Sequence, residues 1–311
     1  MLVEARSDVV ATQEGTEAAS TPVKGRSLWH DAGRRFLRNR AAVFFVGLLV
    51  LIVLFTIIGP YFAQYTIEKV DWSILGKVPA LGGPSLANGH FFGVDQTGRD
   101  LYIRVIQGTQ ISLVVGVLGS AVAVVVGTLY GAIAGYFGGR LDSAMMRFVD
   151  ILYSIPYMFI LILLLIIFGR SFSLLFVGIG LVSWLGMARV VRGQTLTLKN
   201  REFVEAAVAT GVKPLAIVIR HIVPNLLGIV VVYATLLIPE MILLESFISF
   251  LGLGIQEPNT SLGALISEGA QTMQYGTFWQ LGFPLAFFVV ILFAFFFVGD
   301  GLRDALDPKD R

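Results

Sequence analysis

The sequence contains no cysteine and little charge. The absence of Cys excludes disulfide bonds, thiolate metal sites and a cysteine nucleophile. Only 14% of the residues are charged, whereas 56% are hydrophobic and the mean hydropathy is +0.79. Ordinary soluble domains carry roughly 25% charged residues, so this composition indicates an integral membrane protein. The net charge of +2 is too small to indicate a nucleic-acid partner.

Catalytic motifs are missing as well. No G-x-x-x-x-G-K-[ST] phosphate loop occurs, because LGKVPA at 75–80 has the Gly-Lys pair without the hydroxyl. The three histidines are scattered over one tail and two loops, and neither H-E-x-x-H nor G-x-S-x-G appears. His90 with Asp95 and Asp100 is a possible metal site, but a glycine-rich turn before a helix is the better interpretation. We therefore expect no catalytic residue, no cofactor and no metal in this chain.

Long apolar runs dominate the rest of the sequence. A run of about 20 apolar residues can cross the hydrocarbon core of a bilayer as a helix. Six candidates lie near residues 41–62, 109–137, 148–168, 172–190, 226–248 and 280–300. The sequence therefore predicts an all-α integral membrane fold with six transmembrane helices over residues 41–311. Two long connections remain, an external loop at 63–108 and a cytoplasmic loop at 191–225.

The first 40 residues form two segments of different character. Residues 1–25 are polar and lack apolar periodicity, which predicts a disordered cytoplasmic tail. In residues 26–40, apolar side chains recur at helical spacing beside Arg34, Arg35, Arg38 and Arg40, which predicts a basic amphipathic helix at the membrane interface. A secretory signal peptide fits poorly, because the apolar run that follows is long enough to span a bilayer.

The distribution of basic residues predicts the orientation. Eighteen of the 23 Lys and Arg residues lie before residue 41, at 140–147, at 189–220 or after 300. With the N-terminus in the cytoplasm, all of these segments fall on the inside, as the positive-inside rule requires. Both termini are therefore predicted to be cytoplasmic.

The cytoplasmic loop contains a helix, a turn and a second helix. EFVEAAVATG at 202–211 is a good short helix, with Glu202 and Glu205 in its early turns and Gly211 suited to a left-handed stop. Pro214 can open the second helix as its first residue, and we expect Pro224 to end it and to open the fifth span. An alanine-rich helix with a projecting carboxylate is shaped to fill a groove on another protein. A solvated connector is the alternative interpretation.

Three stretches resemble a known family. EAA at 205–207, Gly211 and IVP at 222–224 look like the EAA loop of bacterial ABC importer permeases, with Val223 in place of the usual Leu. FFGVDQTGRDLYIRVIQGTQISL at 91–113 is similar to the segment before the second span of peptide and nickel importer permeases, with Val94 in place of a Thr. LLESFISFLGLGIQEP at 243–258 resembles the exit of their fifth span. From about residue 25 to 311, the chain resembles the C-type permeases of oligopeptide importers.

This resemblance implies a type I ABC importer permease fold in a bacterial inner membrane. It implies four kinds of partner: a homologous second permease, two cytoplasmic ATPase subunits that hold ATP and Mg, an external peptide-binding protein and a peptide substrate. It implies that the loop couples ATP hydrolysis to transport. The implied coupling residues are Glu202, Glu205, Ala206, Ala207, Gly211, Val212, Lys213 and Pro214. Dipeptides, nickel or another small solute are alternative substrates, and a stand-alone secondary transporter is a further alternative.

Two features inside the spans allow more than one interpretation. Gly127, Gly131 and Gly135 recur at every fourth residue, so another helix can approach them closely, either within this chain or in a partner permease. Glu240 and Glu245 lie toward the outer end of the fifth span, where ionisable residues are functional candidates because their burial in lipid is costly. They are candidates for the translocation path or its gate, and equally for internal braces or a wet interface.

Overall fold

The computed structural model describes residues 28–306, apart from the side chains of residues 28, 29, 172, 173 and 181. The tail expected at 1–25 lies outside the described residues. The helices are α1 (Leu28–Arg38), α2 (Arg40–Ile58), α3 (Val78–Leu81), α4 (Leu101–Phe137), α5 (Gly139–Ser154), α6 (Tyr157–Phe168), α7 (Phe172–Leu198), α8 (Glu202–Ala209), α9 (Pro214–Ile217), α10 (Val223–Phe250), α11 (Leu262–Thr272) and α12 (Phe278–Leu306). Short helical turns lie at Gly59–Phe62 (η1), Val218–Ile222 (η2) and Met273–Tyr275 (η3). Within the described residues, extended pairing is limited to two isolated bridges.

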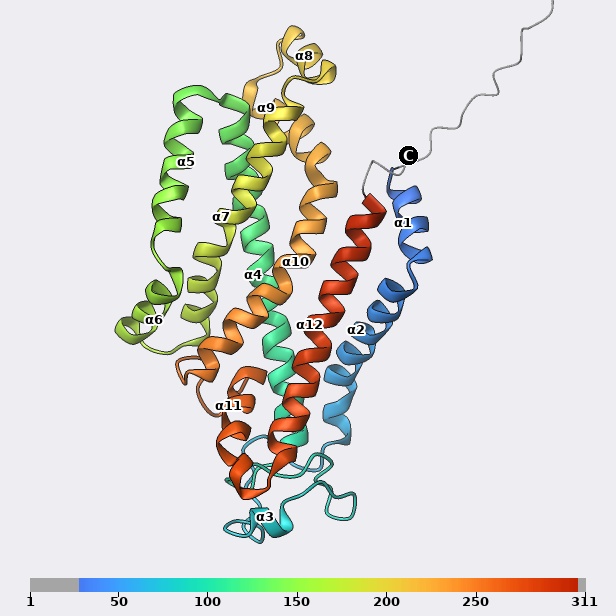
Figure 1. Ribbon diagram of the computed structural model, residues 1–311, viewed down its shortest axis with the longest axis vertical. Helices are drawn as coiled ribbons and strands as arrows, with labels where there is room; N and C mark the ends of the chain where they lie inside the picture. Colours follow the sequence, from blue (N-terminus) through green and yellow to red (C-terminus); the bar gives the residue numbers. More distant parts are fainter. Residues whose placement is uncertain (1–27, 307–311) are drawn as a thin grey trace, which may run out of the picture.

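The long helices run between two opposite ends of the molecule (Figure 1). One end carries α8, α9, α1 and the last turns of α12, and we call it the α8 end. The other carries α3 and α11, and we call it the α3 end. Five helices are long and apolar enough to cross a membrane, and α5 with α6 makes a sixth if the bent pair is one span. The all-α membrane fold with up to six spans is therefore confirmed.

Helix α4 is the central element of the packing. Its buried Val115 and Ala123 join a core with residues of α5, α6, α7 and α10. Its Ala132 joins a second core near the α8 end with Met187 and Val191 of α7. Opposite these, α2 and α12 pack on one another, and Phe45 stacks on Phe297 with ring centroids 4.4 Å apart. The fold is thus a bundle around α4, which fixes the ends of α7 and α10.

Large apolar side chains cover the outside of several helices. In α2, Phe44 is 65% exposed and Leu51 63%, and α6 exposes Phe159 and Phe168 further still. Exposed apolar surface on this scale is costly in water but matches the hydrocarbon core of a bilayer. This exposed apolar surface agrees with a bundle that spans a bilayer.

The third expected span, 148–168, needs correction. The helix begins nearer to the α8 end, at Gly139, and α5 and α6 are bent by 72° at the break that follows Ser154. Ile155 has an extended backbone, as a residue before a proline prefers, and Pro156 then precedes α6. The apolar run is continuous, but this proline breaks the helix.

Three boundaries near the connections also differ from expectation. Helix α4 begins at Leu101, where the Asp100 side chain accepts a hydrogen bond from the Ile103 N–H, so the loop expected at 63–108 ends eight residues sooner. Helix α7 extends to Leu198, into the loop expected at 191–225. Pro224 does not end a helix, because the chain stays helical from Pro214 to Phe250 through the π turn η2. The changed hydrogen-bond register of that turn accommodates the proline.

Candidate functional site

The α8–α9 element, residues 202–217, projects from the α8 end (Figure 1). Helix α8 carries Glu202 and Glu205 in its first turn, where the helix dipole favours carboxylates. Gly211 has a φ of +78°, which is the left-handed conformation that ends the helix. The Gly211 N–H donates to Val208 O at 3.0 Å and the Val212 N–H to Ala207 O at 3.1 Å. Pro214 begins α9 immediately afterwards, so the two short helices meet at a fixed angle.

One face of the element is buried against the bundle. Val204 and Ala207 are 2% and 7% exposed, and they pack with Ile217 and Val218 on residues of α4 and α7. Ala207 therefore anchors α8 to its own chain. The resemblance had grouped Ala207 with Ala206, but only Ala206 is exposed.

The opposite face of the element is exposed. Glu202, Glu205, Ala206, Gly211, Lys213 and Pro214 are exposed, and Val212 is half-buried. Large apolar side chains accompany them, with Val208 56% and Leu215 52% exposed. An open groove between α8 and the ends of α4 and α7 is lined by Tyr136, Phe137, Lys199, Asn200, Val204, Glu205, Val208, Ala209 and Pro214. Exposed apolar side chains beside a groove are typical of protein-binding surfaces.

The glycine strip of α4 lies against α7 of the same chain. A Cβ on Gly131 would come within 2.3 Å of the Ala188 carbonyl oxygen, and one on Gly127 within 2.7 Å of the Trp184 carbonyl oxygen. A Cβ on Gly135 would meet Thr195 at 2.7 Å. Of the two interpretations, the structure therefore favours packing within the chain. This contact also fixes α7, whose end leads directly into α8.

The two glutamates of α10 have different surroundings. Glu245 is fully buried, and its carboxylate accepts hydrogen bonds from the hydroxyls of Ser112 at 3.1 Å, Ser246 at 3.2 Å and Ser249 at 2.7 Å. The Ser112 hydroxyl also accepts from the Leu262 N–H at the start of α11. Glu245 thus holds α4, α10 and α11 together as an internal brace.

Glu240 is exposed, and its carboxylate has no hydrogen bond or ion pair within residues 28–306. It is therefore no internal brace. Of the interpretations left open, the translocation path and a wet interface remain for this residue.

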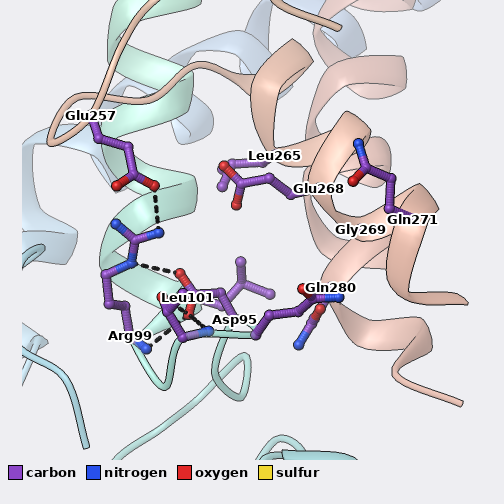
Figure 2. A pocket seen from close by; sticks show the side chains of 11 residues that line it. Asp95, Arg99, Leu101, Glu257, Leu265, Glu268, Gly269, Gln271 and Gln280 are labelled. Atoms are coloured by element: carbon purple, nitrogen blue, oxygen red, sulfur yellow. Dashed lines mark hydrogen bonds and ion pairs between the residues drawn. The ribbon is translucent and has the colours of Figure 1, made fainter. Parts of the chain in front are cut away.

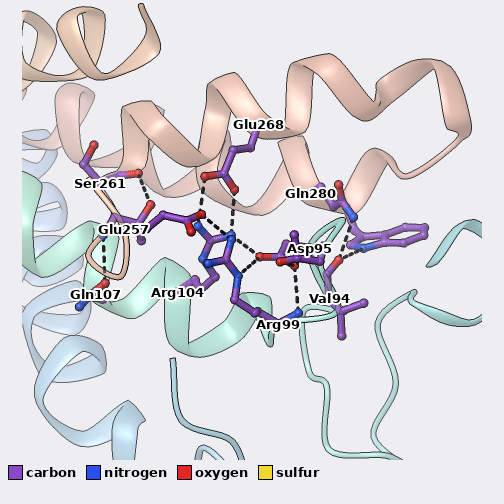
Figure 3. Close-up of polar contacts among 12 residues, drawn as sticks. Val94, Asp95, Arg99, Arg104, Gln107, Glu257, Ser261, Glu268 and Gln280 are labelled. Carbon is purple, nitrogen blue, oxygen red and sulfur yellow. Dashed lines mark hydrogen bonds and ion pairs between the residues drawn. The ribbon is translucent and has the colours of Figure 1, made fainter. Parts of the chain in front are cut away.

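An ion-pair network closes the α3 end (Figure 3). Arg104 of α4 is 1% exposed and binds Asp95 and both oxygens of Glu268 in α11, at 2.8 and 3.1 Å for the latter. Arg99 also binds Asp95, at 2.8 Å, and Glu257, at 2.7 Å. The hydrogen bond from Arg99 lowers the pKa of Glu257, although burial acts in the opposite direction. These contacts join the segment before α4 to the segment between α10 and α12.

A pocket adjoins this network, with Asp95, Arg99, Glu257 and Glu268 in its wall (Figure 2). Its volume is about 190 Å³, which is below the roughly 300–1,000 Å³ of pockets that enclose small-molecule ligands. The pocket is therefore too small to hold a peptide.

His90 stabilises the loop before α4. Its Nδ1 lies 2.8 Å from Asp100 Oδ1, and its ring stacks on Tyr65. Burial raises the pKa of Asp100, while the contact with His90 acts in the opposite direction. Gly93 and Gly98 both have positive φ, as expected for the glycine-rich turn. No group of three or more His, Cys, Asp or Glu side chains suited to a metal ion occurs in the described part of the chain.

Comparisons with known proteins decide the family. A family model described as "Binding-protein-dependent transport system inner membrane component" matches residues 127–311. The chain belongs to this family. A second family model, the N-terminal transmembrane domain of oligopeptide transport permease C, matches residues 27–79 of the permease. The prediction of an ABC importer permease is therefore confirmed.

Individual relatives cover nearly the whole permease. It is 58% identical to the oligopeptide transport system permease protein OppC of Escherichia coli (strain K12), over 93% of this chain and 94% of that protein. It is 53% identical to OppC of Haemophilus influenzae, over 93% and 91% of the two chains. It is 39% identical to the dipeptide transport system permease protein DppC of Bacillus subtilis, over 97% and 92%.

Proposed function

We propose that this permease forms, with a homologous second permease, the path for oligopeptide uptake across a bacterial inner membrane. The single observation that carries the proposal is the exposed α8–α9 element on a chain 58% identical to a permease named for oligopeptide transport. Dipeptides are the second candidate substrate, because a relative named for dipeptide transport is 39% identical. The higher identity favours oligopeptides.

The α8–α9 element contacts one of two cytoplasmic ATPase subunits. The second ATPase contacts the second permease. Glu205, Ala206 and Val208 present a carboxylate and small apolar groups on one exposed face. The buried Val204 and Ala207 transmit a displacement of this face to α4, α7 and α10, with which they share a core. ATP and Mg are held by the ATPases, and this chain catalyses no reaction itself.

Orientation follows from the same assignment. With α8 in the cytoplasm, α1 and the end of α12 lie on the cytoplasmic side, because they occupy the α8 end (Figure 1). The α3 end then faces outward and receives the peptide-binding protein. The segment from α2 into α4 has four basic residues, Lys69, Lys77, Arg99 and Arg104. Few basic residues are expected on the outside, so this small number supports the orientation.

Single-cysteine cross-linking tests the contact with the ATPase, because the chain has no native Cys. We expect Ala206→Cys to cross-link to an ATPase subunit in the assembled complex. Ala207→Cys is the matched control, because Ala207, the next residue in the sequence, is buried and its cysteine should not react. Leu86→Cys, in an 83% exposed position between α3 and α4, should remain free of the ATPase. Cross-linking of Leu86→Cys in place of Ala206→Cys would reverse the orientation and overturn the proposal.

A further inference from the structure

The break between α5 and α6 is surrounded by polar side chains from four helices. We call Tyr153, Tyr157, Arg189, Tyr233 and Glu240 the mid-span patch. The Tyr153 and Tyr233 hydroxyls lie 3.1 and 2.9 Å from the place that a Cβ on Gly186 would occupy, so both converge on α7. Arg189 lies over the Tyr153 ring at 4.1 Å. Glu240 follows Tyr233 by seven residues on α10, so the two residues lie on the same face of that helix, about two turns apart.

Glu240 lies at the depth of the hydrocarbon core. At a rise of 1.5 Å per residue, Glu240 is about 15 Å from the end of α10 at Phe250 and about 25 Å from its start at Val223. A bilayer core is about 30 Å thick. The Glu240 side chain is therefore not close to an aqueous surface along its own helix. Tyr153 lies nearer to the α8 end, about 9 Å along α5 from the exposed Arg147.

The charged members of the patch are exposed on the surface of this chain. Glu240 is exposed and unpaired within residues 28–306. Arg189 and its partner Asp150, 2.7 Å apart, have side chains 46% and 55% exposed. Charges at this depth are costly against lipid, so they face protein or a water-filled space. Arg189 is neutralised by Asp150, which leaves the Glu240 carboxylate without a cation.

We propose that the mid-span patch lines the translocation path, and that Glu240 binds the α-ammonium group of a peptide in transit. A carboxylate that lacks a cation is complementary to an ammonium group, and the tyrosine rings of the patch are surfaces on which a cationic group can bind. The tyrosine hydroxyls can also donate to peptide carbonyl groups. Every unmodified peptide carries an α-ammonium group, so this contact does not depend on the peptide's side chains. The inference rests on the proposed function and adds a residue that contacts the substrate.

Uptake into proteoliposomes tests the contact directly. The reconstituted importer, with Glu240→Gln or wild-type permease, is given one labelled peptide in its free-amine and N-acetylated forms at saturating binding protein. For each peptide, the ratio of variant to wild-type rate cancels the preference of the binding protein. We expect Glu240→Gln to slow the free-amine peptide about tenfold and to leave the acetylated peptide unchanged.

Three results separate the alternatives. Equal slowing of both peptides would overturn the proposal, since Glu240 would not distinguish their termini. Loss of the second permease on purification of Glu240→Gln would also overturn it, because the carboxylate would then pair with a cation of that subunit. Failure of the wild type to import any peptide would instead refute the proposed function.

A second measurement does not depend on transport rate. Glu240→Cys should react with a membrane-impermeant cationic thiol reagent, and excess peptide should slow the reaction during turnover. Phe293→Cys is the control, because this side chain of α12 is 53% exposed next to Phe297, on an apolar surface that we expect to contact lipid, and its cysteine should not react. Equal reactivity of the two variants would contradict a path-lining position for Glu240.

Discussion

Replacement of Arg104 by methionine tests the network at the α3 end. The guanidinium is 1% exposed and binds Asp95, whose side chain is 7% exposed, and Glu268, whose side chain is 42% exposed. Removal of one partner of a buried ion pair costs about 3–5 kcal/mol, because the other charge stays buried. Asp95 keeps Arg99 at 2.8 Å, and Glu268 can be hydrated, so the lower end, about 3 kcal/mol, is expected. Arg104 Nε is buried without a hydrogen-bond partner, which already lowers the stability of the wild type. Removal of this group recovers part of that free energy, which also favours the lower value.

The assay is thermal denaturation of the purified importer in detergent, followed by loss of the monodisperse peak. At about 2.1 cal/mol/K of unfolding entropy per residue, a change of 3 kcal/mol corresponds to a decrease of about 5 °C for a chain of 311 residues. Glu257→Gln is the control, because Glu257 is 64% exposed and its ion pair contributes about 0–1 kcal/mol. If Arg104→Met denatured at the wild-type temperature, the reasoning from buried charge would be refuted.

Two further substitutions test the helix contacts. Gly131→Ala should destabilise the importer by about 1–3 kcal/mol, because its Cβ meets the Ala188 carbonyl oxygen. Gly193→Ala is the control, because no atom lies within 4 Å of its Cβ. The same denaturation assay compares the two variants, and equal denaturation temperatures would exclude tight packing at the glycine strip. Glu245→Ala should cost about 1–3 kcal/mol by depriving buried serine hydroxyls of their acceptor, and Glu245→Gln should cost less. Limited proteolysis of the segment between α10 and α11 measures this loosening, and identical digestion of both variants would argue against the brace.

Much of the bundle could be predicted because apolar run length is a direct consequence of bilayer thickness. The short helix at 202–209, the left-handed Gly211 and the start of α9 at Pro214 also agree with the structure, since each depends on local backbone chemistry. The break at Ile155 carried a local signal too, the proline at 156, but the apolar run that crosses it concealed the signal.

Other features depend on contacts that no local pattern contains. Helix α11 is too short to span and only moderately apolar. Its place is fixed by Ser112 and Arg104 of α4, which bind Leu262 and Glu268 of α11 and lie far from them in the sequence. The burial of Ala207 beside an exposed Ala206 depends on how α8 rests on α4 and α7. The different surroundings of Glu240 and Glu245 likewise depend on which neighbours face α10. The helical spacing of the two glutamates does not identify those neighbours.

Peptide-stimulated ATP hydrolysis by the reconstituted importer tests the central claim most directly. Wild type is compared with Glu205→Lys, after co-purification of all subunits is verified. Asp304→Lys is the control, because it makes the same charge change at an exposed position of α12 at the α8 end. The account predicts that stimulation collapses in Glu205→Lys and persists in Asp304→Lys. Unchanged stimulation and uptake in Glu205→Lys would contradict the assignment of α8 as the contact that couples ATP hydrolysis to transport.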